Sequence, residues 1–255
     1  MARSPVPSVL VVRPRRNPDS FVEALQARGC RVYSLPVMAI EPLPASPAIK
    51  GRILDFDHYN KAVVISANAA RLALDWLDQY WPQLPLGVEF FAVGRSTAGV
   101  LENAGIESRF PAHDPTSEGL LGLRELDDLT GERVLIFRGQ GGRDKLAREL
   151  RHRGARVDYC ELYRRRPLDE HGTRIRGLIA DGAIDVLAVH SGEVLRAFLA
   201  LVPTGPWQGR LTLLVPGERV AELARELGFT RVITAGGALP EDMADALWRC
   251  YTGSD

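Results

Sequence analysis

The sequence predicts an α/β protein made of two related, doubly wound parallel-sheet domains. One observation is an internal repeat at an offset of nearly half the chain, because Val9-Leu10 recurs as Val134-Leu135 and Ser66 recurs as Ser191. Another is that short β-branched runs alternate with amphipathic segments, the pattern of parallel strands joined by crossover helices. Finally, 255 residues accommodate two domains of about 120 residues each. A cleft between two such domains is where we expect a ligand.

The elements of the first half are a strand at 9–12, a helix at 19–28, a strand at 31–35, a strand at 63–65 and a helix carrying Leu72, Trp76, Leu77 and Tyr80. Phe21 and Leu25 share one face of the first helix. Gly29 stands where a helix end requires a left-handed residue. Ser66 or Asn68 would cap the second helix. For Ser66 and Ser191, which follow strands, helix capping stays open as an alternative to ligand binding.

The second half repeats this order, with a strand at 134–137, a helix carrying Leu146 and Leu150, a strand from Arg156, a strand at 186–189, a helix carrying Leu195, Phe198 and Leu199, and two further helices at 220–227 and 243–251. Gly154 takes the place of Gly29. Equivalent segments at 36–42 and 161–167 are extended in character and bounded by proline, so we expect them to cross between the domains.

Composition narrows the function classes. The net charge is zero and the pI is near 7.0, which argues against a non-specific binder of nucleic acid or membranes. The first residues lack a signal peptide and no run reaches the length of a membrane helix, so we expect a cytoplasmic protein. Cys30, Cys160 and Cys250 are too few and too far apart for a disulfide framework or a zinc site, and the histidines are scattered, so no metal is expected.

The glycine-rich segment 138–144 follows a strand and precedes a helix. Its backbone N–H groups could bind an anionic group, with a purely structural turn as the alternative. A dinucleotide fingerprint fails, because Asp144 stands where a glycine is needed and the equivalent segment 13–17 has no glycine.

Hydroxyl groups mark several strand ends. Ser66 and Ser191 lie at carboxyl ends of strands, where open α/β sheets bind ligands, but neither is in a nucleophile elbow. Thr97 belongs to a strand-to-helix turn, while Thr116 is expected to start a helix. Tyr163 lies on the second crossing. An aromatic residue there usually packs, yet a phenol beside a cleft can donate a proton or a hydrogen bond. The adjoining segment 164–166 is interpreted as solvated arginine surface, with a contribution of positive potential as the alternative.

The motifs, in chain order, are Arg13-Pro14, 66–69, 92–98, 116–120, 138–143 and Tyr163. This ordered set resembles the bacterial uroporphyrinogen-III synthase family nearly end to end. The resemblance implies two α/β lobes joined by a two-stranded hinge, whereas the repeat alone suggests contiguous halves. The implied first lobe is 1–37 with 168–255, the second is 43–162, and the crossings are 38–42 and 163–167.

The resemblance also implies an activity. Hydroxymethylbilane would be cyclised to uroporphyrinogen III with inversion of ring D and loss of water, without a cofactor, in the synthesis of haem, sirohaem and cobalamin. Tyr163 would assist departure of the hydroxyl group. A monomer is implied, with a transient contact to the enzyme of the preceding step.

The substrate carries eight carboxylates, which helix-start N–H groups and two arginines could bind. The residues so assigned are Arg13, Ser66, Asn68, Thr97, Arg138, Gly139, Ser191 and Gly217. Segments 189–193 and 215–219 depart from the Ser-Pro and Ser/Thr-rich versions common in the family. The main rival is a non-catalytic, two-lobed cytoplasmic protein that binds a small anionic ligand. A nucleotide-dependent enzyme is the other rival, and the failed glycine fingerprint disfavours it.

Overall fold

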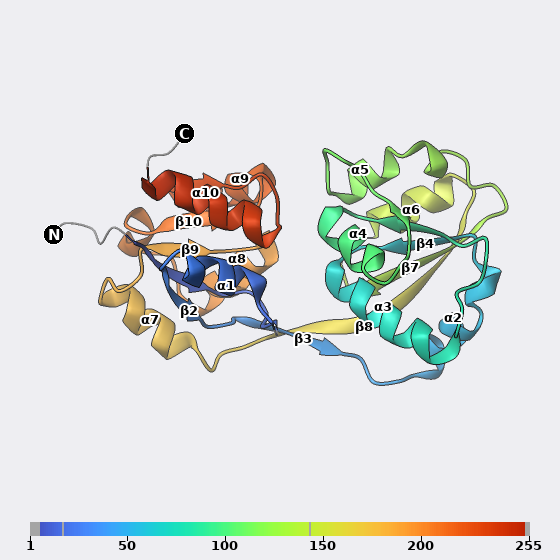
Figure 1. The fold of residues 1–255 in the computed structure, drawn as a ribbon, viewed down its shortest axis with the longest axis horizontal. Coiled ribbons are helices and arrows are strands. Elements are labelled where there is room, and N and C mark those ends of the chain that lie inside the picture. Colours follow the sequence, from blue (N-terminus) through green and yellow to red (C-terminus); the bar gives the residue numbers. More distant parts are fainter. Residues whose placement is uncertain (1–5, 17, 143, 253–255) are drawn as a thin grey trace. The chain divides into compact units, whose positions relative to one another are not determined.

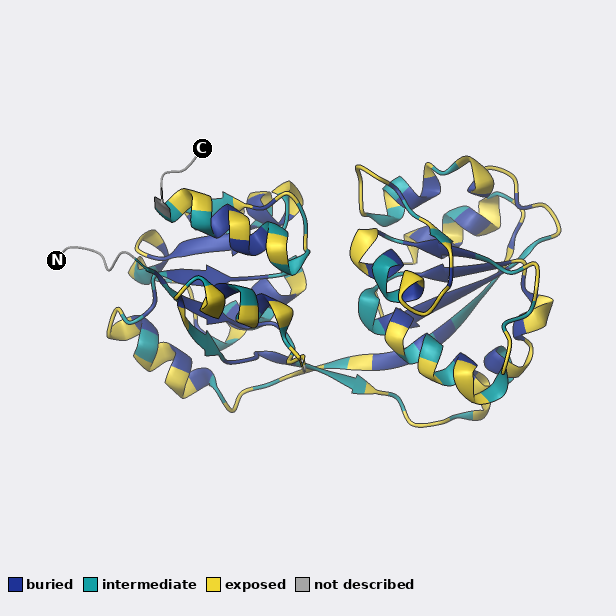
Figure 2. Ribbon diagram, in the orientation of Figure 1, coloured by how far each residue is buried: buried dark blue, intermediate teal, exposed yellow. Residues whose placement is uncertain are grey.

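The computed structural model describes residues 6–16, 18–142 and 144–252, which form two compact units (Figure 1). Unit 1 comprises Met1–Ala39 and Arg166–Asp255, and unit 2 comprises Ile40–Arg165. Each unit has its own sheet with helices around it, and the central strands are buried while the helices expose one side (Figure 2). The predicted α/β class with two parallel sheets is confirmed.

Unit 1 contains a five-stranded parallel sheet with the order β11-β10-β9-β1-β2. The strands are β1 (Ser8–Val11), β2 (Arg31–Ser34), β9 (Val186–Ala188), β10 (Thr212–Val215) and β11 (Val232–Thr234). Successive side chains of a strand point to opposite faces, so Val9 and Val11 enter one core while Leu10 and Val12 enter the other. Both faces of the sheet are therefore buried, as in a doubly wound fold.

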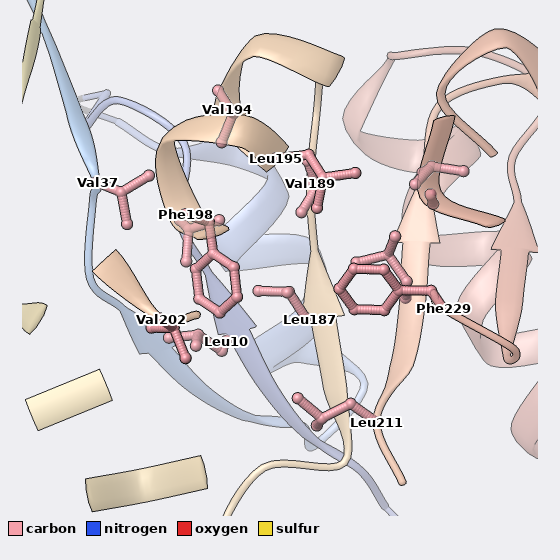
Figure 3. Close-up of a cluster of buried hydrophobic side chains, with 14 of the residues drawn as sticks. Leu10, Val37, Leu187, Val189, Val194, Leu195, Phe198, Val202, Leu211 and Phe229 are labelled. Atoms are coloured by element: carbon pink, nitrogen blue, oxygen red, sulfur yellow. The ribbon is translucent and has the colours of Figure 1, made fainter. Parts of the chain in front are cut away.

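Helices cover both faces of this sheet. They are α1 (Ser20–Ala27), α7 (Gly172–Ala180), α8 (Gly192–Leu201), the 3₁₀ helix η3 (Pro206–Gly209), α9 (Glu218–Glu226) and α10 (Pro240–Thr252). Helices α1 and α10 pack on the face that carries Val9, and α7, α8 and α9 pack on the other. Figure 3 shows Phe198 of α8 and Phe229 beside Leu187 of β9 in this second core.

Unit 2 contains a six-stranded sheet with the order β3-β8-β7-β4-β5-β6. The strands are β3 (Met38–Pro42), β4 (Lys61–Val64), β5 (Glu89–Ala92), β6 (Ser108–Arg109), β7 (Arg133–Gly139) and β8 (Arg156–Pro167). The helices are α2 (Pro47–Leu54), η1 (Phe56–His58), α3 (Ala67–Tyr80), α4 (Arg95–Glu102), α5 (Ser117–Leu121), η2 (Arg124–Leu126) and α6 (Lys145–His152). Helices α2, α3 and α4 bury one face of the sheet, and α5 and α6 bury the other.

The units do not coincide with the halves of the repeat. Strands β1 and β2 of the first half lie beside β9, β10 and β11 of the second half, and β7 and β8 join β4, β5 and β6. Equivalent strands still hold equivalent positions, because β1 corresponds to β7 and β9 corresponds to β4 in the repeat. Each sheet is thus completed by strands from the other repeat.

Strand β3 lies beside the long strand β8 at the edge of the unit 2 sheet. The N–H of Leu43 donates to the carbonyl of Leu162 (2.9 Å), and the N–H of Leu168 donates to the carbonyl of Val37 (3.0 Å). These bonds have the pattern of two antiparallel strands, so the chain passes from one unit to the other along β3 and returns along β8.

Candidate active site

Each sheet has one point at which the direction of strand succession reverses. In unit 2 it lies between β4 and β7, and in unit 1 it lies between β1 and β9. Open parallel sheets bind ligands beyond the carboxyl ends of the strands at such a point. Ser66 and Gly139 lie there in unit 2, and Arg13 and Ser191 lie at the equivalent place in unit 1.

Tyr163 belongs to β8 and is only 1 % exposed. Its hydroxyl oxygen lies 3.0 Å from Ser66 Oγ, and Nη2 of Arg165 donates to the same oxygen over 3.2 Å. The N–H of Gln140 donates to the Tyr163 carbonyl over 2.6 Å and fixes the strand register beside the ring. The phenol is therefore held in place at both its backbone and its hydroxyl.

The absence of a side chain at Gly139 makes room for the Tyr163 ring. A Cβ atom at this position would lie 2.5 Å from Cε2 and 2.6 Å from Cζ of that ring. Gly139 ends β7 at a register irregularity, and helix α6 begins only at Lys145. Gly139 is thus part of a strand end against Tyr163, rather than of a helix N-terminus.

Helix starts occupy the same edge of the unit 2 sheet. Ser66 caps α3, since its Oγ accepts from the N–H of Ala69 over 3.0 Å, and Asn68 lies in the first turn, half-buried. Thr97 lies in the first turn of α4 and is 1 % exposed. Both the capping role and a ligand role remain compatible with Ser66, because the capping bond uses only one of its lone pairs.

Arg138 is buried, and its donors point to its own loop. Nε donates to the carbonyl of Gly139 over 3.2 Å, Nη2 donates to the carbonyl of Gly141, and Nη1 lies 3.4 Å from Oδ1 of Asp144. The guanidinium also stacks 4.6 Å from the centroid of Tyr159. These contacts hold the glycine-rich loop together, so substrate binding by Arg138 stays a prediction.

Unit 1 has the equivalent arrangement. Arg13 is 3 % exposed, forms an ion pair with Asp19 and stacks 5.3 Å from the Phe21 ring centroid. Its Nε and Nη1 are buried and have no hydrogen-bond partner among the described residues. Ser191 caps α8 by accepting from the Val194 N–H over 3.3 Å. Gly217 is the N-cap residue of α9.

His190 precedes Ser191 and brings a titratable group to this edge. Its ring packs edge-on against Phe21 with centroids 4.9 Å apart, and both ring nitrogens are buried without a hydrogen-bond partner in the described chain. Burial of the ring, together with the charges of Arg13 and Arg16, lowers the pKa of His190 well below its usual value. The imidazole is therefore neutral near pH 7.

The interpretation of 164–166 as solvated arginine surface is confirmed for Arg164 and Arg166, which are exposed, and is wrong for Arg165. Arg164 is exposed and pairs with Glu41, but Arg165 is half-buried and stacks 5.2 Å from the Tyr163 ring centroid. Sequence reasoning missed this contact, although residues two apart on a strand share a face. That spacing was the signal that could have identified Arg165.

Other groups add no further chemistry to the site. Within the described part of the chain, no group of three or more His, Cys, Asp and Glu side chains could hold a metal ion. Cys30 and Cys160 are buried and Cys250 is exposed, all as free thiols. Among the described residues, no helix is both long and apolar enough to cross a membrane.

Comparison with known proteins identifies one family. The family model described as "Uroporphyrinogen-III synthase HemD" matches residues 19–245. Uroporphyrinogen-III synthase of Salmonella typhimurium is 33% identical over 244 residues, which cover 94% of this chain and 99% of that protein. The Escherichia coli K12 enzyme of the same name is 32% identical over 247 residues, with 94% and 99% covered.

Solved structures support the fold. A mutant uroporphyrinogen III synthase from Thermus thermophilus matches with a TM-score of 0.66 at 19% identity, covering 97% of this chain and 100% of that one. The Helicobacter pylori protein, solved as uroporphyrinogen-III synthetase, matches with a TM-score of 0.60 at 15% identity, covering 96% and 100%. At these identities the likeness shows that the fold is shared.

Proposed function

The chain belongs to the uroporphyrinogen-III synthase family, and from this premise we propose how its residues carry the reaction. It is a cyclising lyase of porphyrin biosynthesis, which converts hydroxymethylbilane into uroporphyrinogen III with inversion of ring D and loss of water. The observation that carries this conclusion is the sequence match to the family over nearly the whole chain. No observation favours the alternative of a non-catalytic binding protein.

The site proposal centres on the hydroxyl pair formed by Tyr163 and Ser66. Loss of the hydroxyl of the hydroxymethyl group as water requires a proton at the departing oxygen, and a neutral phenol can supply a proton or a strong hydrogen bond. The 3.0 Å contact between the two hydroxyl oxygens lies at the switch point of the unit 2 sheet. This placement supports Tyr163, assisted by Ser66, as the group that helps the hydroxyl leave.

The carbon skeleton then rearranges in a defined order. Departure of water leaves an azafulvene, the substituted carbon of ring D attacks it, and the resulting spiro intermediate breaks down and recloses as the inverted isomer. The linear substrate also cyclises unaided to the uninverted isomer. Holding its two ends in the productive geometry is therefore a main task of the protein, and positioning of this kind can lower a barrier by several kcal/mol.

The substrate carboxylates need local donors because the chain has no net charge. We assign them to N–H groups at the starts of α3, α4, α8 and α9, which Ser66, Gly94, Ser191 and Gly217 precede. The assignment of Arg13 to a substrate carboxylate is supported by its buried Nε and Nη1 atoms, which lack a hydrogen-bond partner among the described residues. Asn68, Thr97, Arg138 and Gly139 complete the proposed set.

Assembly and location belong to the same proposal. We assign a monomer in the cytoplasm that makes a transient contact with the enzyme supplying hydroxymethylbilane. The support is membership of the family, with bacterial relatives named uroporphyrinogen-III synthase. Light scattering of the purified chain tests the monomer, and a stable dimer in dilute solution would contradict it.

The test of the site is Tyr163→Phe, which removes the hydroxyl and keeps the ring. We expect kcat for type III product to fall while the urea midpoint changes little. Since hydroxymethylbilane is lost spontaneously as well, the rate is compared with that of buffer alone. Wild-type kcat in a folded Tyr163→Phe protein would remove Tyr163 from the mechanism. Binding of NAD or ATP without turnover of hydroxymethylbilane by the wild type would favour the nucleotide-dependent alternative.

A further inference from the structure

Arg165 and Tyr163 lie two residues apart on β8 and contact each other. Nη2 of Arg165 is 3.2 Å from the Tyr163 hydroxyl oxygen, and its guanidinium carbon is 5.2 Å from the ring centroid. Arg164, one residue away, pairs with Glu41 over 3.0 Å instead. One arginine of the segment therefore covers the phenol, while its neighbour faces elsewhere.

Arg165 limits how the Tyr163 and Ser66 hydroxyl groups can donate and accept hydrogen bonds. Arginine can only donate, so it occupies a lone pair of the Tyr163 oxygen. The Ala69 N–H likewise occupies a lone pair of Ser66 Oγ. Of the two hydroxyl hydrogens, one joins the oxygens and the other has no acceptor among the described residues. With both oxygens already accepting, the pair is left with one hydrogen to donate outward.

We propose that Arg165 is a positioning residue, which orients the Tyr163–Ser66 pair as a hydrogen-bond donor to the departing hydroxyl of the substrate. This inference rests on the proposed role of Tyr163. As the C–O bond breaks, its electrons leave with the oxygen, which takes the proton and departs as water. The pyrrole nitrogen keeps its hydrogen and its lone pair forms a new double bond, so the azafulvene is formed in its protonated, positively charged state. The negative charge left on the hydroxyl pair lies beside the guanidinium, which stabilises it.

The proton is returned later in the same turnover. After the final closure, ring D regains its aromatic form by losing the proton from its newly bonded carbon, and the hydroxyl pair takes up one proton to regain its starting state. The net reaction therefore releases only water, as the established activity requires.

The experiment compares Arg165→Gln with Arg164→Gln as a matched control, each in the wild-type chain and in the Tyr163→Phe background. We expect Arg165→Gln to lower kcat about tenfold or more, the range of a lost charge-assisted hydrogen bond, with KM changed less than about twofold. Arg164→Gln should retain wild-type kcat. In the Tyr163→Phe background, Arg165→Gln should lower kcat by less than about twofold, because the hydroxyl through which Arg165 acts has been removed.

Each outcome is decisive once circular dichroism and urea unfolding show a folded protein. Wild-type kcat in Arg165→Gln overturns the proposal, and so does an equal loss with and without the Tyr163 hydroxyl, which means a structural role. If Tyr163→Phe itself is fully active, the proposed function of Tyr163 fails and this inference fails with it. Should Arg165→Gln not fold, Arg165→Lys serves instead, because it keeps the charge and loses the planar donor, and an intermediate kcat is expected.

Discussion

Replacement of Gly139 by alanine should disturb the site through a single methyl group. The new Cβ would lie 2.5 Å from Cε2 of Tyr163, well inside van der Waals contact. The ring cannot easily yield, because it is 1 % exposed, its hydroxyl is bonded to Ser66 and Arg165, and its carbonyl is bonded to Gln140. Either the ring or the end of β7 must shift.

Overpacking of a buried site in this way costs about 1–3 kcal/mol of unfolding free energy. A displaced hydroxyl also loses its productive geometry, so kcat should fall roughly ten- to a hundredfold. Gly99→Ala is the matched control, since a Cβ at Gly99 in α4 meets nothing within 4 Å. There the same substitution should raise the unfolding free energy by about 1 kcal/mol, the helix-propensity gain, with kcat unchanged.

The assay is urea unfolding of both variants combined with the rate of type III product formation. Loss of both stability and kcat in Gly139→Ala, but not in Gly99→Ala, is the expected pattern. Wild-type stability and wild-type kcat in Gly139→Ala would refute the reasoning, because the Tyr163 ring would then not depend on the space at Gly139.

Three further predictions concern charged groups. Arg138→Ala should weaken substrate binding by about 1.5–3 kcal/mol, seen as a higher KM, and an unchanged KM would contradict its assignment. Arg13→Met should lower the unfolding free energy by about 3 kcal/mol, since the partly buried Asp19 loses its cation; a wild-type urea midpoint would oppose this. The third is His190→Ile, which places at 190 the residue found at the equivalent Ile65. His190 is neutral when folded but binds a proton below about pH 6.5 when unfolded, so acid favours unfolding. Between pH 7.5 and 5 the wild type should lose stability relative to His190→Ile, by at most about 2 kcal/mol, and parallel urea-stability curves would contradict this.

Local chemistry made many elements predictable from the sequence. Gly29 and Gly154 have φ of +80° and +96°, as the predicted helix ends require. Asp19 caps α1, and Thr116 caps α5 by accepting from the Gly119 N–H. Such signals are short-range, so a single sequence carries them. Helix α2 was missed even though Ser46 caps it and a proline opens it, because its apolar pattern is short.

The exchange of strands between the repeats could not be read from the repeat itself. Strands β4 and β9 carry equivalent residues, so either could lie beside β1 as far as sequence pattern is concerned. The resemblance to the family, rather than periodicity, indicated discontinuous lobes. Pairing of β1 with β9, and of β4 with β7, depends on tertiary packing that local propensity does not encode.

The sequence indicated which residues belong to the candidate site better than it indicated which contacts they make. Ser66 and Tyr163 were both named, and their hydroxyl oxygens prove to be 3.0 Å apart. Arg138 also donates to carbonyl groups of its own loop, which the sequence did not indicate, and its binding of a substrate carboxylate stays a prediction. Whether guanidinium N–H groups donate to carbonyl groups of their own loop depends on distances in the folded protein. Residue type and spacing alone therefore could not show that Arg165 contacts the Tyr163 hydroxyl.

The most direct test of the central claim is the isomer composition of the product. Purified protein receives freshly generated hydroxymethylbilane, and the oxidised porphyrins are separated by chromatography. The account predicts type III product in excess over the type I isomer that forms spontaneously. Type I alone, from protein shown to be folded, would contradict the account and leave only the shared fold.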